Sequence, residues 1–255
     1  MRLNFRKMGE GKPLFILHGL FGLSDNWNTV GKILAEHFQI YLIDLRNHGS
    51  SPHSDEWTYP AMAEDILKLT QDEKIYKITL LGHSLGGKVA MQFASMYPEK
   101  LEKLIVVDMA PKYYSTDRNM DFTRNLLQVN LSEMKSRKEA EEKILSVVDK
   151  WNIAQLLLKN IYWNDDNKLA WKLNLKVIAD NVDIIEKTFS QEKKSVNTPT
   201  LFIRGEKSNY ILDSDIAEIK KIFPHSEYKT IEAAGHWVHA DKPSEFAEEI
   251  IKFII

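Results

Sequence analysis

Short apolar segments recur along the chain, most of them end at a glycine or a polar residue, and longer amphipathic segments separate them. This alternation is typical of a mostly parallel sheet whose strands are joined by helices. Buried strands are expected at 14–17, 39–43, 77–81, 104–107, 200–203 and 227–232. Apolar residues spaced three and four apart predict helices at 26–37, 60–72, 84–97, 213–223 and 243–255. The sequence therefore predicts an α/β fold with a mostly parallel central sheet flanked by helices.

The segment from residue 112 to residue 190 has a different character. It contains no glycine and no strand-like apolar run, but it has several helical patterns. We therefore expect a helical cap, residues 112–190, inserted into a sheet core made of residues 1–111 and 191–255.

Composition excludes several classes of function. The 255 residues include 34 basic and 36 acidic side chains, and a net charge of −2 gives no reason to expect nucleic acid or an anionic membrane as a partner. No apolar run approaches the roughly 20 residues that span a bilayer, and no secretory signal is evident, so we expect a cytoplasmic protein without stable membrane insertion. The absence of cysteine excludes a thiolate nucleophile.

The strongest chemical signal is the G-x-S-x-G pattern of residues 82–86, which lies where a predicted strand meets a predicted helix. Such a pattern can place a serine on a sharp, strained turn with its hydroxyl exposed at the edge of the sheet. Ser84 is therefore the candidate nucleophile, and the backbone N–H of Leu85 is one candidate donor to an oxyanion.

Two other glycine-containing segments follow predicted strands. His236 lies after the sixth strand and follows Gly235, so a loop there can bring its imidazole back toward the sheet edge as a base. The segment 18–22 (HGLFG) follows the first strand and can supply a second oxyanion donor, for which we favour Leu20, with Phe21 as the alternative. His239 could pair with His236 on a metal, but no third ligand is evident, so we expect no metal and no cofactor.

Taken together, these motifs resemble the α/β-hydrolase superfamily, and most of all its YbfF-like bacterial esterases. The resemblance rests on residues 17–22 (LHGLFG), 44–52 (DLRNHGSSP), 82–87 (GHSLGG), 107–111 (VDMAP) and 235–243 (GHWVHADKP). It implies an α/β-hydrolase fold, a nucleophile, acid and histidine that form a triad, and an oxyanion hole after the first of these strands. In the 44–52 segment we expect a structural turn, with Arg46 pairing with Asp44 or a carbonyl and His48 bonding to backbone.

The acid departs from the commonest pattern of the superfamily. Most members carry it after the strand that follows the cap, where this chain has 204–210 (RGEKSNY) and no aspartate. Asp108, at the end of the strand next to the one that carries Ser84, is our choice, and YbfF-like enzymes resemble this arrangement. Glu206 and Asp213 are the alternatives.

We therefore expect a serine hydrolase that cleaves small-molecule carboxylic (acyl) esters or thioesters through an acyl-enzyme intermediate. The scaffold also supports C–C bond hydrolases, lactonases and cofactor-free perhydrolases, because a fold does not imply one function. A non-catalytic binder of small molecules is the alternative outside enzymes.

Overall fold

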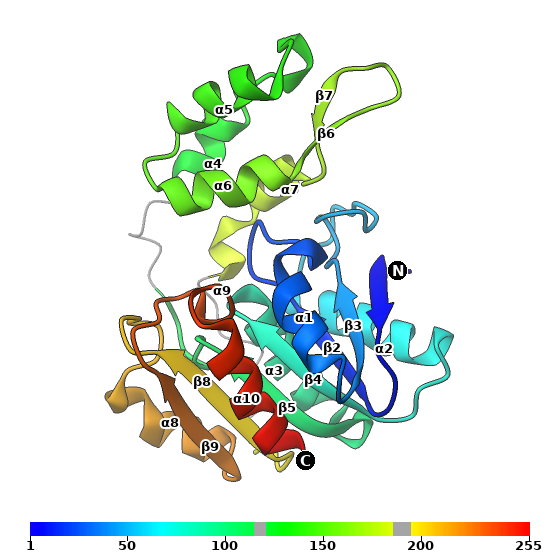
Figure 1. Cartoon of the computed structure of the whole chain (residues 1–255), viewed down its shortest axis with the longest axis vertical. Helices are drawn as coiled ribbons and strands as arrows, with labels where there is room; N and C mark the ends of the chain where they lie inside the picture. Colours follow the sequence, from blue (N-terminus) through cyan, green and yellow to red (C-terminus); the bar gives the residue numbers. More distant parts are fainter. Residues whose placement is uncertain (115–120, 186–194) are drawn as a thin grey trace.

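Seven strands form one sheet in the order β1-β3-β2-β4-β5-β8-β9 in the computed structural model, which describes residues 1–114, 121–185 and 195–255 (Figure 1). All neighbouring pairs are parallel except β1 with β3. The strands are β1 (Phe5–Met8), β2 (Pro13–Leu17), β3 (Gln39–Ile43), β4 (Ile78–His83), β5 (Leu101–Val107), β8 (Thr200–Gly205) and β9 (Ser226–Ile231). The predicted mostly parallel sheet is confirmed.

Strand β1 was not predicted from the sequence. It is an antiparallel edge strand of four residues, two of which are charged, and none of the four is fully buried. An edge strand with polar side chains has no apolar run and no clear alternation, which explains why pattern analysis misses it.

Helices cover both faces of the sheet (Figure 1). Leu14 and Ile16 of β2 belong to one core cluster together with residues of α1 and α10, whereas Phe15 and Leu17 belong to the other together with residues of α2 and α3. These opposite assignments follow from the alternation of side chains along a strand. The helices around the sheet are α1 (Asn28–Leu34), α2 (Tyr59–Asp72), α3 (Leu85–Met96), α8 (Ile216–Ile222), α9 (Val238–Asp241) and α10 (Pro243–Ile254).

Two predicted helices are shorter than expected. The segment 26–37 contains the end of a 3-10 turn, Ser24–Trp27, followed by α1, which ends at Leu34. The segment 213–223 begins with the 3-10 turn Asp213–Asp215 before α8. Apolar spacing locates the buried face of a helix but does not distinguish a 3-10 turn from the α-helix that continues it.

The described segment between β5 and β8, residues 121–185, lies outside the large sheet and forms a separate layer in Figure 1. Its helices are α4 (Asp121–Leu126), α5 (Arg137–Leu145), α6 (Trp151–Lys159) and α7 (Leu175–Asp180), with short 3-10 turns at Leu131–Glu133 and Val182–Ile185. We call the segment 121–185 the cap. The predicted boundary between residues 190 and 191 lies outside the described residues.

The expectation that this segment has no strand is wrong. Strands β6 (Ile161–Trp163) and β7 (Leu169–Trp171) form an antiparallel hairpin. Its turn contains no glycine; Asn167 adopts a φ of 56°, and the Asn164 side chain accepts a bond from the Lys168 N–H at 2.8 Å. Asparagine tolerates this backbone region, so it replaces the glycine that usually signals a turn.

The loop after β3 is held by buried charge. Arg46 forms two hydrogen bonds with the Asp65 carboxylate of α2, at 2.6 and 3.0 Å, and donates to the Glu56 and Ala61 carbonyls. Asp44, by contrast, accepts from the N–H groups of Ser24 and Ser50 and from the Asn4 side chain. The suggested Arg46–Asp44 pair is therefore wrong, whereas the carbonyl contact is confirmed.

His48 is buried in the same loop, and its Nδ1 lies 3.0 Å from the Arg46 carbonyl oxygen. Because a carbonyl only accepts, Nδ1 carries the proton in this contact. The predicted bond from His48 to backbone is confirmed.

Asp65→Asn should lower the free energy of unfolding by about 3–5 kcal/mol, because it removes the buried carboxylate that pairs with the Arg46 guanidinium and with the Met1 ammonium. Asp72→Asn is the matched control on the same helix, since it removes only the exposed pair with Lys68 and should cost less than about 1 kcal/mol. Urea unfolding of both variants gives the comparison. Equal losses would show that the Arg46–Asp65 pair does not hold this loop.

Candidate active site

Ser84 lies at the sharp turn between β4 and α3 and has a φ of 53°, a conformation that costs a non-glycine residue about 1–3 kcal/mol. Two glycines make the turn possible. A Cβ on Gly82 would lie 2.1 Å from the Gly86 carbonyl oxygen, and a Cβ on Gly86 would lie 2.6 Å from the Leu17 carbonyl oxygen. The two glycines therefore let strand and helix approach closely. Ser84 itself is only partly buried, so its side chain is accessible.

His236 and Asp108 contact each other directly. His236 Nδ1 lies 2.7 Å from Asp108 Oδ2, the carboxylate is fully buried, and the imidazole is 15% exposed. Because a carboxylate accepts hydrogen bonds, Nδ1 carries the proton and Nε2 keeps its lone pair. The carbonyl of His236 also accepts a bond from Nε2 of His83, the residue before Ser84, at 2.8 Å. The fold thus brings residues 84, 108 and 236 to one edge of the sheet.

Asp108 is held in an unusual backbone conformation at the end of β5. Its φ is 49°, its N–H donates to the Ile203 carbonyl at 2.7 Å, and its Oδ1 accepts from the Gly205 N–H at 3.4 Å. The Ser208 hydroxyl donates to Oδ2, the same oxygen that accepts from His236. These contacts fix the carboxylate toward the imidazole.

The two alternative acids have other partners. Glu206 accepts from the Ala233 N–H at 2.8 Å, and this bond supports the loop that carries His236. Asp213 is 83% exposed and pairs with Arg204 at 2.7 Å. Of the three carboxylates considered from the sequence, Asp108 is therefore the one that the fold places against the imidazole.

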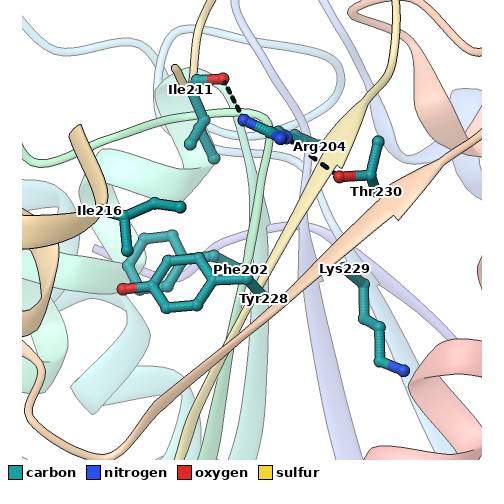
Figure 2. Close-up of a pocket in the computed structure, with 7 residues that line it drawn as sticks. All are labelled: Phe202, Arg204, Ile211, Ile216, Tyr228, Lys229 and Thr230. Atoms are coloured by element: carbon teal, nitrogen blue, oxygen red, sulfur yellow. Dashed lines mark hydrogen bonds between the residues drawn. The ribbon is translucent and has the colours of Figure 1, made fainter. Parts of the chain in front are cut away.

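Arg204 connects the strand ends to the loop that follows β8. Its guanidinium donates to the Thr230 hydroxyl at 3.0 Å and to the Ile211 carbonyl at 3.3 Å (Figure 2). Arg204 also lines a pocket together with Phe202, Ile211, Ile216, Tyr228, Lys229 and Thr230. None of Ser84, Asp108 and His236 lines this pocket. The role of Arg204 here is structural: its hydrogen bonds hold the loop in place.

Sequence reasoning missed two residues of that loop. Ser208 bonds to Asp108, and the Tyr210 ring stacks on His236 with centroids 3.9 Å apart and an angle of 18° between the planes. In the sequence, the segment 204–210 was considered only as the place where most members of the superfamily carry the acid and this chain has no aspartate. The hydroxyl at position 208 was the available signal, but only the fold shows which carboxylate it meets.

The predicted oxyanion loop forms a tight turn beside Ser84. The Gly22 N–H donates to the Gly19 carbonyl at 3.0 Å, so Leu20 and Phe21 are the central residues of the turn. A Cβ on Gly19 would lie 3.2 Å from Ser84 Cβ, which places this backbone against the serine. Within the described ranges, the N–H groups of Leu20, Phe21 and Leu85 have no hydrogen-bond acceptor in the protein. Free, oriented N–H groups are what an oxyanion hole requires.

His239 has a packing role. It is buried, and its ring stacks on Trp27 with centroids 4.0 Å apart and an angle of 11° between the planes. In residues 1–114, 121–185 and 195–255, no group of three or more His, Cys, Asp or Glu residues is placed to hold a metal ion. In the same ranges, no helix combines the length and the apolar character that crossing a membrane demands.

A parallel sheet with a serine at a strained strand–helix turn, and a histidine–aspartate pair beside it, defines the α/β-hydrolase class. The sequence matches the family described as alpha/beta hydrolase fold over residues 12–243. The chain therefore belongs to the α/β-hydrolase family.

Curated relatives and solved structures sharpen this assignment. The chain is 36% identical over 248 residues to the sn-1-specific diacylglycerol lipase ABHD11 of Mus musculus, covering 94% of this chain and 80% of that protein. It is 30% identical over 260 residues to Esterase YbfF of Escherichia coli, covering 100% and 99%. A solved structure described as a marine microorganism esterase has a TM-score of 0.95 and 41% identity, with 99% of each chain covered. The resemblance to YbfF-like esterases is confirmed.

Buried histidines predict a loss of stability in acid. Burial lowers the pKa of His239 to about 3, and the His236 imidazole beside it adds to this shift. Below about pH 6.5, His239 therefore binds a proton in the unfolded chain but not in the folded one. The free energy of unfolding should consequently fall as the pH drops from 6.5 toward 3. Each buried histidine of this kind lowers the free energy of unfolding by about 1.4 kcal/mol for every pH unit of acidification in this range.

His239→Phe keeps an aromatic ring against Trp27 and removes this proton, so its unfolding free energy should fall less steeply between pH 6 and pH 5. His225→Gln, at an exposed position, is the control and should keep the steep slope of the parent. Urea unfolding at several pH values measures both slopes. An unchanged slope in His239→Phe would contradict the assignment of a buried neutral imidazole.

Proposed function

We propose that this chain hydrolyses carboxylic acyl esters or thioesters, with Ser84 as nucleophile, His236 as general base and Asp108 as the acid of a catalytic triad. The observation that carries the proposal is the 2.7 Å contact between His236 and Asp108 beside the strained turn of Ser84. Membership in the α/β-hydrolase family and the named esterases among its relatives support ester hydrolysis.

The first half of the reaction acylates the enzyme. Ser84 Oγ attacks the acyl carbonyl carbon while Nε2 of His236 takes the hydroxyl proton, and Asp108 stabilises the imidazolium that forms. The negative charge moves to the carbonyl oxygen, which accepts from the Leu85 N–H and from a second N–H of the 19–22 turn, that of Leu20 or alternatively Phe21. The C–O or C–S bond then breaks, and the leaving alcohol or thiol takes the proton from His236.

The second half repeats these steps with water. The oxygen of a water molecule attacks the acyl carbon while His236 takes a proton from that water. The bond between Ser84 Oγ and the acyl carbon then breaks, His236 returns the proton to Ser84, and the carboxylic acid leaves the free enzyme. No other reactant is needed. We expect short or medium acyl esters as substrates. A cytoplasmic location remains a prediction from the sequence.

Ser84→Ala should lower kcat for 4-nitrophenyl esters by at least about 10³-fold, because no nucleophile remains at the turn. The variant should also lose labelling by a fluorophosphonate probe, while its far-UV circular dichroism stays unchanged. Ser50→Ala, at an exposed serine of another strand-end loop, is the control and should keep both activity and labelling. Full turnover in Ser84→Ala would remove the serine from the mechanism.

Asp108→Asn should lower kcat by about 10²- to 10⁴-fold, because an amide cannot orient and stabilise the imidazolium as a carboxylate does. Glu206→Gln and Asp213→Asn are matched neutralisations of the alternative acids and should each reduce kcat less than about tenfold. Steady-state kinetics of the three purified variants at one pH rank the carboxylates. A larger loss in Glu206→Gln or Asp213→Asn than in Asp108→Asn would move the acid to that residue.

A further inference from the structure

A side chain of the cap reaches the turn that we propose as the oxyanion hole. Asn160 follows α6, is completely buried, and its Nδ2 donates to the Phe21 carbonyl at 2.7 Å and to the Leu156 carbonyl at 2.9 Å. Both acceptors are carbonyls, so they identify this atom as the amide nitrogen. Residues 139 positions apart in the chain are thereby joined at the edge of the site.

The turn that Asn160 contacts is strained. Phe21 has a φ of 60° at the third position of the 19–22 turn, where glycine or asparagine is the ordinary choice. Phe21 is 3% exposed, and its ring centroid lies 5.6 Å from that of Phe122 on α4 in the cap. A strained backbone persists only where the surrounding structure supports it, and here the cap supplies both supports.

The peptide unit between Phe21 and Gly22 is held at both ends. Its carbonyl accepts from Asn160, and its N–H donates to Gly19. A fixed orientation of this unit restrains the preceding backbone, which carries the free N–H groups of Leu20 and Phe21. The direction of an oxyanion donor is therefore coupled to the position of the cap.

The two hydrogen bonds of the Asn160 amide nitrogen are accompanied by an unfavourable feature of the same side chain. Its Oδ1 is buried and has no partner among the described residues, and an unmade hydrogen bond of this kind is unfavourable. A leucine of similar size would avoid that orphaned oxygen, although it would release the Phe21 carbonyl. The bond to the turn is thus the feature that only the asparagine provides.

We propose that Asn160 is a positioning residue of the oxyanion hole, through which the cap holds the 19–22 turn in its strained, competent form. The inference rests on the function proposed above. A displaced N–H donor weakens binding of the transition state more than binding of the substrate, because full charge develops on the oxygen only during attack.

The test is Asn160→Leu, assayed with 4-nitrophenyl esters and with a trifluoromethyl ketone that forms a tetrahedral adduct with the serine. We expect kcat to fall about 10- to 100-fold with KM changed less than about threefold, and the affinity for the ketone to fall in parallel with kcat. Asn174→Leu is the matched control. Asn174 also joins the cap to the core: its backbone N–H donates to the Asn47 carbonyl at 3.0 Å, and its side-chain amide donates to Asn47 Oδ1 at 3.2 Å. The substitution removes the side-chain bond, and among the described residues Asn174 makes no hydrogen bond to the turn.

The proposal would be overturned if kcat and the ketone affinity of Asn160→Leu stayed within about threefold of the parent. Equal losses of kcat and ketone affinity in Asn174→Leu would also overturn it, because they would indicate a general loosening of the cap. If Asn160→Leu does not fold, Asn160→Ser replaces it, since a serine hydroxyl is too short to reach the Phe21 carbonyl. Ser84→Ala, measured in parallel, separates the two hypotheses. Activity that depends on Ser84 but not on residue 160 rejects only the positioning role.

Discussion

The close approach of β4, α3 and the end of β2 is the constraint on which the rest of the site depends. A methyl group on Gly82 or Gly86 would collide with backbone carbonyl oxygens, which cannot move aside as a flexible side chain can. Because both positions lack a Cβ, the chain can turn sharply at Ser84 and begin α3 at Leu85. The same contact brings the backbone of Gly19 against the serine. The proposed nucleophile and the proposed oxyanion donors thereby lie close together.

Around this turn, the protein uses buried hydrogen bonds to hold groups that are unfavourable on their own. Asp108 is fully buried in a left-handed backbone conformation, yet it accepts from His236, Ser208 and Gly205. The Arg46–Asp65 pair holds the loop after β3 in a comparable way. In each case the cost of burying a charge is offset by a full set of partners. The loops at the carboxyl edge of the sheet can therefore remain rigid without regular secondary structure.

Much of the architecture was accessible from sequence patterns because it depends on local periodicity. The six parallel strands, the sequence position of the strand–helix turn and the order of the flanking helices were all predicted. The antiparallel strand β1 and the cap hairpin β6–β7 were missed, because a polar edge strand and an asparagine turn lack the usual apolar and glycine signals. The carboxylate partner of Arg46 was also missed, since Asp65 lies 19 positions away on α2 and only packing brings the two together.

By itself, the sequence determined the α/β class and selected Ser84 and His236 as candidates, because strand ends, glycines and chain order are properties of neighbouring residues. It limited the candidates for the acid of the triad to three carboxylates, those of Asp108, Glu206 and Asp213. Tertiary structure alone decided which of them faces the imidazole, that Ser208 and Tyr210 surround this pair, and that Asn160 of the cap bonds to the turn at Phe21. The physical reason is that hydrogen bonds and ring contacts depend on distance through space. The partners in the three hydrogen bonds are 100, 128 and 139 positions apart, where local patterns carry no information about contact.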